Sequence, residues 1–168
     1  MLLHGVTSSG KTEIYIHLIQ EIIKSGKQVL YLLPEIALTT QIISRLKKHF
    51  GSKIAVYHSR LNSRERVNVW KQMLDDAESG AGEAKCPVIL GARSALFLPF
   101  NNLSLVIVDE EHENSFKQFE RAPLYHARDS AIMFASFFKA KTLLGSATPS
   151  FETFFNTKQN KYGCVSLP

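Results

Sequence analysis

Cysteine is scarce in this chain, and its scarcity excludes several classes of small protein. Only two cysteines occur among 168 residues, Cys86 and Cys164, and each lacks a second Cys or a His at metal-ligand spacing. The sequence therefore predicts neither a disulfide framework nor a cysteine-based metal site, and it favours a reducing compartment.

Long apolar runs are also absent from the sequence. No uninterrupted hydrophobic stretch approaches the roughly 20 residues that cross a bilayer, and the N-terminus has neither the basic segment nor the apolar region of a signal peptide. We therefore expect a cytoplasmic protein without a membrane partner. Hydrophobic residues still make up 45% of the chain, which is enough for one domain with a substantial core.

Charge is only mildly unbalanced. The chain carries 20 Lys and Arg residues against 15 Asp and Glu residues, for a formal net charge of +5. Such an excess suits a polyanionic partner, but it is common among proteins that have none. The charge balance alone leaves nucleic-acid binding open.

The most specific feature lies near the N-terminus, where Gly5-Val6-Thr7-Ser8-Ser9-Gly10-Lys11-Thr12 fits the phosphate-loop pattern G-x-x-x-x-G-K-[ST]. Glycine lets such a turn aim its backbone N–H groups at a triphosphate. Lys11 opens a helix whose N-terminal dipole favours an anion, and its ammonium can reach the β- and γ-phosphates. Thr12 offers a hydroxyl to Mg²⁺. The pattern predicts that these eight residues bind ATP and that Thr12 helps to bind Mg²⁺.

Hydrophobic periodicity predicts strands that alternate with helices. The expected strands are 2–4, 28–33, 53–57, 87–90, 103–108 and 142–144, and the expected helices are 11–24, 36–50, 62–78, 126–139 and 151–158, with Ser63 capping the third helix. Residues 79–85 are expected to form a surface loop. This alternation predicts an α/β domain with a mainly parallel sheet, whose ligands lie at the carboxyl ends of the strands.

A second chemical site follows the strand expected at 103–108, which ends in Asp109-Glu110-Glu111-His112. We expect Asp109 to hold Mg²⁺, directly or through water, and Glu110 to activate the water that attacks the γ-phosphorus. Lys11, Asp109 and Glu110 are thus the predicted catalytic residues, and Glu111 is assigned a positional role. A solvated loop after a strand is the alternative for this run taken alone.

A third short segment, Ser146-Ala147-Thr148, follows the strand expected at 142–144. Together with His112, its hydroxyls are expected to couple the metal-binding acids to a moving partner surface. Gly145 is expected to let the backbone pass close to the nucleotide. Ser and Thr before a proline and a helix are also ordinary capping residues, so only the position of this segment makes it a candidate.

The order of these segments resembles the first motor lobe of superfamily 2 helicases, with motifs I, Ia, Ib, II and III in sequence. Motifs Ia and Ib correspond to Pro34-Glu35 and to Gly91-Ala92-Arg93-Ser94. The match narrows to primosomal replication-restart DNA helicases of the DEAH type, which have segments similar to 34–39, 93–97, 115–118 and 125–129. The resemblance spans nearly the whole chain.

The resemblance implies a three-layer, RecA-like P-loop NTPase lobe of a 3′ to 5′ DNA helicase that uses ATP and Mg²⁺. Its implied partners are single-stranded and forked DNA, primosome proteins and single-strand-binding proteins. Residues 1–168 are expected to form this single lobe, without the family's N-terminal DNA-binding region, second motor lobe and zinc module. Weak or no turnover is expected, because the arginine finger comes from the second motor lobe of the same polypeptide.

DNA contacts also follow from the resemblance. Two groups of residues are expected to touch the tracked strand without reading its sequence. The first group lies along the carboxyl edge of the sheet, and the second forms an aromatic-rich loop at 113–128 that couples single-stranded DNA to hydrolysis by base stacking. The expected DNA-binding residues are Pro34, Glu35, Thr39, Arg93 and Ser94 in the first group, and Phe116, Lys117, Phe119, Arg121, Tyr125 and Arg128 in the second. Capped helix starts and a packed loop with solvated charges are the alternatives.

Three other functions fit part of this pattern. A small-molecule P-loop kinase would share the fold and Lys11, but an arginine-bearing lid is not evident and the Asp-Glu pair suits the activation of water. A non-catalytic module would use the basic surface to bind DNA or a protein. An RNA helicase or another DNA helicase stays within the motor class, and the segment 125–129 argues against it only by resemblance.

Overall fold

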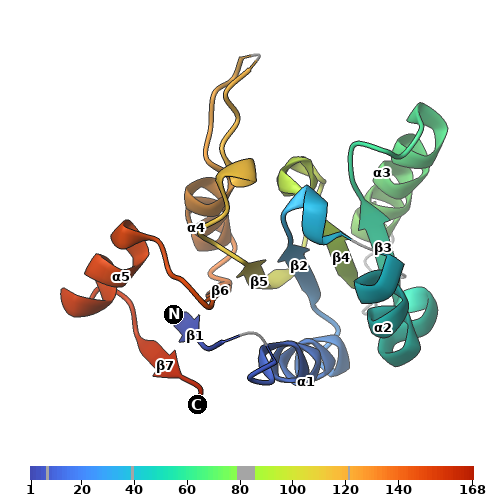
Figure 1. Cartoon of the computed structure of the whole chain (residues 1–168). Coiled ribbons are helices and arrows are strands. Elements are labelled where there is room, and N and C mark those ends of the chain that lie inside the picture. Colours follow the sequence, from blue (N-terminus) through green and yellow to red (C-terminus); the bar gives the residue numbers. More distant parts are fainter. Residues whose placement is uncertain (7, 39, 79–85, 121) are drawn as a thin grey trace.

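Parallel strands form the centre of the molecule (Figure 1). The structure is a computed structural model, and it describes residues 1–6, 8–38, 40–78, 86–120 and 122–168. Within this part of the chain, seven strands make one sheet in the order β3-β4-β2-β5-β6-β1-β7, and all pairings between them are parallel. The strands are β1 (Leu2–His4), β2 (Gln28–Leu32), β3 (Ile54–Tyr57), β4 (Val88–Gly91), β5 (Leu103–Asp109), β6 (Lys141–Ser146) and β7 (Cys164–Ser166). The predicted α/β class is confirmed.

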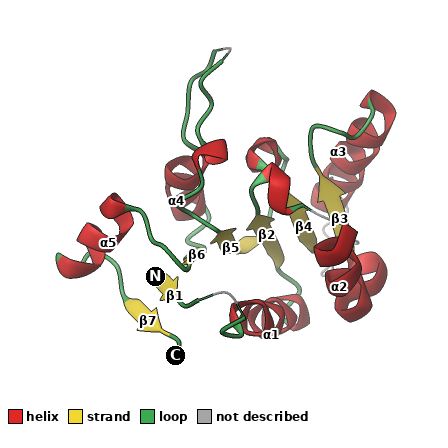
Figure 2. Ribbon diagram, in the orientation of Figure 1, coloured by secondary structure: helices red, strands yellow, loops and turns green. Residues whose placement is uncertain are grey.

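Helices cover both faces of the sheet and make three layers (Figure 2). They are α1 (Lys11–Lys24), α2 (Thr40–Phe50), α3 (Ser63–Glu78), α4 (Ala127–Phe137) and α5 (Phe151–Lys158). Ile19 of α1 and Leu46 of α2 are buried in the core on one face, whereas Met73 of α3 and Ala131 of α4 are buried in the core on the other. Helix α5 lies beside the edge formed by β1 and β7 (Figure 1).

The central strand β2 shows why the sequence folds in this way. All five of its residues are buried, because β4 and β5 flank it and helices cover both of its faces. Side chains alternate along a strand, so Val29 and Tyr31 enter one core while Leu30 and Leu32 enter the other. Burial on both faces explains the continuous apolar run in the sequence.

Two local predictions are wrong. The helix expected at 36–50 is divided into a 3₁₀ turn, Glu35–Ala37, and α2, because Leu38 leaves the helical conformation with ψ 60° and buries its side chain in the core. Asn62, and not Ser63, caps α3: the Asn62 Oδ1 accepts a hydrogen bond from the Glu65 amide at 2.9 Å, and the Asn62 amide donates to the Glu65 carboxylate at 2.8 Å. This reciprocal pair is a capping box. The loop predicted at 79–85 lies outside the described residues.

Strand β7 was not predicted from the sequence. Its three residues are exposed, so they carry no apolar pattern, and they become a strand only because the segment pairs with β1. The described helices include none that is both long and apolar enough to cross a membrane.

Candidate functional site

The phosphate loop connects β1 to α1 at the carboxyl edge of the sheet. Ser8 and Gly10 have left-handed φ angles of 70° and 89°, which turn the chain sharply before the helix. The Lys11 ammonium donates hydrogen bonds to the carbonyl oxygens of Gly5, at 2.6 Å, and of Val6, at 3.1 Å. Lys11 therefore folds back across the loop that it follows. Thr7, also predicted to bind ATP, lies outside the described residues.

The loop and the acidic segment face each other across one cleft. Its volume is about 460 Å³, and its lining consists of Ser8, Gly10, Lys11, Thr12, Glu13, Arg45, Asp109 and Glu110. Strands β1 and β5 lie on either side of β6, and α1 passes from β1 to β2 and packs against β5 on the way. The topology thus brings together residues that are about a hundred positions apart in the sequence. The cleft is large enough for a ligand of nucleotide size.

Two tyrosines that sequence reasoning missed hold the Asp109 carboxylate. The Tyr15 hydroxyl donates to Oδ1 and the Tyr31 hydroxyl to Oδ2, each at 3.0 Å. A Cβ on Gly145 would collide with the Tyr15 hydroxyl. This glycine therefore makes room for the tyrosine, whereas the prediction for Gly145 concerned the nucleotide. The only sequence signal was a tyrosine within each of two apolar runs, since a buried hydroxyl needs a partner.

Electrostatics in the cleft disfavour the charged form of both acids. Burial raises the pKa of Asp109, although hydrogen bonds from Tyr15 and Tyr31 counteract this effect. Burial first, and then the charge of Asp109, raise the pKa of Glu110, while Lys11 counteracts them. A bound cation would stabilise both carboxylates.

The donor atoms in this cleft suit magnesium. Mg²⁺ takes oxygen ligands, and proteins usually hold it by one or two carboxylates together with substrate phosphates. The Asp109 and Glu110 carboxylates and the Thr12 hydroxyl line the cleft together and supply such oxygens. Among the residues that the structure describes, no cluster of three or more His, Cys, Asp or Glu side chains could hold a metal by itself. The oxygen donors that line the cleft are those that Mg²⁺ uses when it binds together with phosphates.

Glu111 joins three elements at the carboxyl edge of the sheet. Its buried carboxylate accepts hydrogen bonds from the Ser150 amide at 2.7 Å and from the Thr153 hydroxyl at 2.8 Å. It also pairs with Arg128 Nη1 at 3.0 Å. These contacts agree with a positional role for Glu111. They also correct the prediction for Arg128, whose guanidinium is buried among Glu111, Asp129 and Ser150 and is not available to DNA.

The residues predicted to couple the acids to motion do meet. His112 Nδ1 lies 2.8 Å from the Ser146 hydroxyl. The same hydroxyl oxygen accepts a hydrogen bond from the Thr148 amide at 3.0 Å. Thr148 therefore takes part through its backbone, whereas the prediction rested on its hydroxyl.

A second, smaller cavity of about 200 Å³ lies beyond the carboxyl ends of β2 and β4. Pro34, Glu35, Arg93, Ser94, Phe116 and Tyr125, all predicted to bind DNA, contribute to its lining, as do Ser59, Arg66, Ser115 and Gln118, which were not predicted. Hydrogen bonds from Ser59 are the main cause of the lowered pKa of Glu35. Arg93 donates to the carbonyl oxygens of Ser115 and Lys117 at 3.1 and 3.2 Å. These bonds tie the cavity to the aromatic-rich loop. Thr39 and Arg121 lie outside the described residues.

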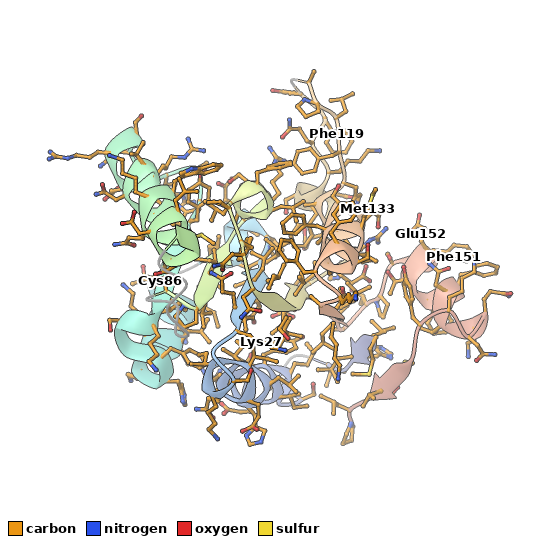
Figure 3. The ribbon with its side chains drawn as sticks, turned by 180° about the vertical axis from the view of Figure 1, so that it is seen from behind. Lys27, Cys86, Phe119, Met133, Phe151 and Glu152 are labelled. Atoms are coloured by element: carbon orange, nitrogen blue, oxygen red, sulfur yellow. The ribbon has the colours of Figure 1, made fainter. Side chains whose placement is uncertain are left out.

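The aromatic-rich loop projects from the sheet as a hairpin (Figure 1). Lys117 and His126 form an antiparallel bridge at its base. Phe119 lies toward its far end (Figure 3) with 66% of its surface exposed, and the Lys117 ammonium lies 5.0 Å from the centre of its ring. Phe116 is 1% exposed, which contradicts the predicted role in base stacking. Of these two phenylalanines, only Phe119 presents its ring to solvent.

The match to a family model decides the class of this protein. The model of the DEAD/DEAH box helicases matches residues 1–156. The chain belongs to the DEAD/DEAH box helicase family. Membership confirms the resemblance seen in the sequence, and it favours the helicase class over a small-molecule kinase.

Full-length relatives of this helicase-family chain include replication restart proteins. The chain is 48% identical over 166 residues to the replication restart protein PriA of Rickettsia felis, covering 99% of this chain and 24% of that protein. It is 43% identical over 166 residues to PriA of Bacillus subtilis, covering 99% of this chain and 20% of the relative. The chain thus spans between a fifth and a quarter of the length of these relatives.

Solved helicase structures share the fold. RecG bound to a three-way DNA junction superimposes with a TM-score of 0.68 at 21% identity, over 99% of this chain and 20% of that one. A DEAD box protein from Methanococcus jannaschii gives 0.65 at 16% identity, over 99% of this chain and 45% of that one. At these identities the likeness concerns the fold alone, and it confirms the predicted RecA-like architecture of this DEAD/DEAH box chain.

Proposed function

We propose that this chain is the ATP- and Mg²⁺-binding motor lobe of a 3′ to 5′ DNA helicase that acts in replication restart. One observation carries the proposal: a single cleft is lined by Lys11 and Thr12 of the phosphate loop on one side and by Asp109 and Glu110 on the other. A helicase family model matches the chain, and the relatives include replication restart proteins.

Each of the cleft residues has a separate role in the proposed hydrolysis of ATP. The loop from Gly5 to Thr12 binds the phosphates, and Lys11 transfers its hydrogen bonds from the loop carbonyls to the phosphate oxygens. Thr12 and Asp109 hold the magnesium, which neutralises charge on the phosphates when it is bound. Glu110 takes the proton of the attacking water. Its side chain lines the cleft together with the phosphate loop, and a general base must lie within reach of the water that it activates.

DNA binds along the carboxyl edge in this proposal. The cavity around Pro34, Glu35, Arg93 and Ser94 holds the backbone of single-stranded or forked DNA, and Phe119 with Lys117 on the hairpin stacks on a base and holds a phosphate. The hairpin follows Glu110 by only a few residues. DNA binding at the hairpin changes the position of Asp109 and Glu110 through this short connection and through His112 and Ser146.

The proposed function also needs parts that this chain does not contain, namely a second motor lobe and partner proteins. We propose that residues 1–168 are one lobe, that a second motor lobe of a longer polypeptide supplies an arginine finger, and that the protein works in the cytoplasm with primosome and single-strand-binding proteins. The relatives are four to five times as long as this chain, since it covers 20% to 24% of them. Such an arginine contributes roughly 10³ to 10⁵ in rate in related phosphoryl-transfer enzymes.

Nucleotide titration of the purified chain tests the proposal. We expect a fluorescent ATP analogue to bind more tightly with Mg²⁺ than with a chelator, and Lys11→Ala to weaken binding about 10- to 100-fold, the effect of losing charge-assisted hydrogen bonds. Lys27→Ala is the matched control, because Lys27 is an exposed lysine that precedes the amino end of β2, whereas Lys11 follows the carboxyl end of β1. Equal losses in both variants, or binding that ignores Mg²⁺, would refute the proposed site.

A further inference from the structure

The Asp109 carboxylate is already engaged by protein donors. A carboxylate has about four lone-pair sites for hydrogen bonds or metals. Its Oδ1 accepts two hydrogen bonds, from the Tyr15 hydroxyl at 3.0 Å and from the Glu110 amide at 3.1 Å. Its Oδ2 accepts one, from the Tyr31 hydroxyl at 3.0 Å. Among the residues that the structure describes, these three contacts leave one lone-pair site, on Oδ2.

Both tyrosines are built into the core and aimed at this carboxylate. Tyr15 and Tyr31 have 0% of their surface exposed, and their rings pack edge to face with centres 5.5 Å apart. Tyr15 lies on α1, the helix that follows the phosphate loop. Tyr31 lies on β2, the strand that pairs with β5. A side chain at Gly145 would collide with the Tyr15 hydroxyl. Packing therefore fixes where both hydroxyls lie.

Breaking either tyrosine hydrogen bond to Asp109 would cost free energy. Leaving a buried hydroxyl without a partner costs about 1 to 3 kcal/mol, and rotation of either hydroxyl away from the carboxylate would incur this cost. Two donors on different oxygens also fix the plane of the carboxylate, which one donor does not. The pair thus restricts both the position and the rotation of the Asp109 side chain.

We infer that Tyr15 and Tyr31 are positioning residues that orient the Asp109 carboxylate, so that it serves magnesium or a magnesium-bound water through one oxygen, Oδ2. The inference rests on the proposed function, and it names residues from two further elements that prepare the metal site. The competing explanation is that both tyrosines only fill the core, with hydroxyls that happen to find an acceptor.

Magnesium dependence separates the two explanations. We would titrate Mg²⁺ against the chain with a non-hydrolysable fluorescent ATP analogue, for the wild type, Tyr15→Phe, Tyr31→Phe and the double variant. Tyr57→Phe is the control, because Tyr57 is a buried tyrosine on β3, three places from β5 in the sheet. Thermal unfolding of each variant records the contribution to packing.

The two positioning variants should each raise the Mg²⁺ concentration for half-maximal binding about 10-fold, as losses of residues that orient metal ligands do. Nucleotide affinity in the presence of a chelator should stay within about 2-fold, because the phosphate loop is intact. Tyr57→Phe should leave both quantities unchanged. An unchanged Mg²⁺ requirement, or a parallel loss of chelator-resistant binding, would overturn the inference and leave the proposed function standing.

Two further outcomes complete the test. Wild-type binding that is indifferent to Mg²⁺ would overturn the proposed function together with this inference. If a variant fails to fold, the wild-type chain labelled with ¹³C at tyrosine Cζ decides the question by NMR. The Tyr15 and Tyr31 resonances should then shift when Mg²⁺ and the analogue are added, and that of Tyr57 should not. Unshifted Tyr15 and Tyr31 resonances would overturn the inference.

Discussion

Glu110 occupies a position that suits its proposed chemistry better than it suits stability. Glu110 directly follows β5 and has a left-handed φ of 52°. Burial first, and then the Asp109 charge, raise the pKa of its carboxyl. Left-handed backbone at a residue other than glycine costs free energy. Residues at functional sites often carry such costs, which the rest of the fold offsets.

Glu110→Gln should raise the free energy of unfolding at neutral pH, because glutamine removes a charge that burial and, after it, the Asp109 carboxylate disfavour. When folding raises the pKa of a carboxyl, the folded state holds the proton more tightly. The free energy of unfolding then falls as pH rises from the unfolded pKa, about 4.3, to the higher folded value. The gain should therefore be present at about pH 7 and absent below about pH 4.

Urea unfolding across this pH range measures the effect. Glu120→Gln is the control, since Glu120 is exposed on the hairpin and away from Asp109. A Glu110→Gln variant whose gain is the same at every pH, or that is less stable than the wild type at neutral pH, would contradict the argument.

At the scale of elements, Glu111 is the residue that holds the carboxyl edge together. It connects the end of β5 to α4 through Arg128 and to the start of α5 through Ser150 and Thr153. Removing one partner of a buried ion pair leaves the other charge uncompensated, which costs more than the pair contributes as a whole.

We expect Glu111→Ala to lower the free energy of unfolding by about 3 to 5 kcal/mol, because the buried Arg128 loses its buried partner. Chemical denaturation monitored by circular dichroism gives the value. Glu152→Ala, an exposed glutamate on α5 (Figure 3), should cost less than about 1 kcal/mol. Similar losses in the two variants would show that the Glu111 network does not stabilise the fold.

The aromatic-rich loop at 113–128 offers a matched pair of phenylalanines, one buried and one exposed. Phe119→Ala should weaken binding of a fluorescently labelled oligothymidylate about 10-fold, since one base–aromatic stack contributes about 1 to 3 kcal/mol, and should leave thermal unfolding unchanged. Phe116→Ala should instead cost about 3 to 5 kcal/mol of stability, because its ring is buried. Fluorescence anisotropy and thermal unfolding separate the two effects. Unchanged DNA affinity in Phe119→Ala would remove this residue from the proposed DNA path.

At the scale of the whole molecule, one lobe presents two different sites on a single sheet edge. The cleft at Lys11 and Asp109 and the cavity at Arg93 both lie beyond carboxyl ends of parallel strands. Only the cleft carries paired carboxylates and the phosphate loop, whereas the cavity carries Arg66 and Arg93. The two linings share no residue, so in the proposed function DNA and ATP would not compete for the same side chains.

The 168 residues alone should hydrolyse ATP slowly, at least about 10³-fold below a longer polypeptide that includes a second motor lobe. Single-stranded DNA should add little to this rate. Phosphate release with and without DNA measures both quantities, and Glu110→Gln controls for contaminating ATPases. Robust DNA-stimulated turnover by the chain alone would show that it carries its own arginine finger.

Much of the fold and part of the site could be predicted from the order of residues. The phosphate loop and Asp109-Glu110 are short runs whose chemistry follows from neighbouring residues. The continuous apolar run of β2 likewise predicts a buried strand. Arg128 and Phe116 were misjudged as DNA-binding residues because a cation or an aromatic ring looks the same in a sequence whether it is exposed or buried.

The chain's own order of residues determined the alternation of strands and helices, the phosphate loop and the acidic end of β5. These features depend on local backbone preference and on hydrophobic period, which neighbouring residues specify. Only the tertiary structure decided that Tyr15 and Tyr31 meet at Asp109, that Arg128 pairs with Glu111 and that residues 164–166 become an edge strand. Each of these depends on which distant elements the sheet order brings into contact, since hydrogen bonds and ion pairs form between atoms that are close in space, whatever their separation along the chain.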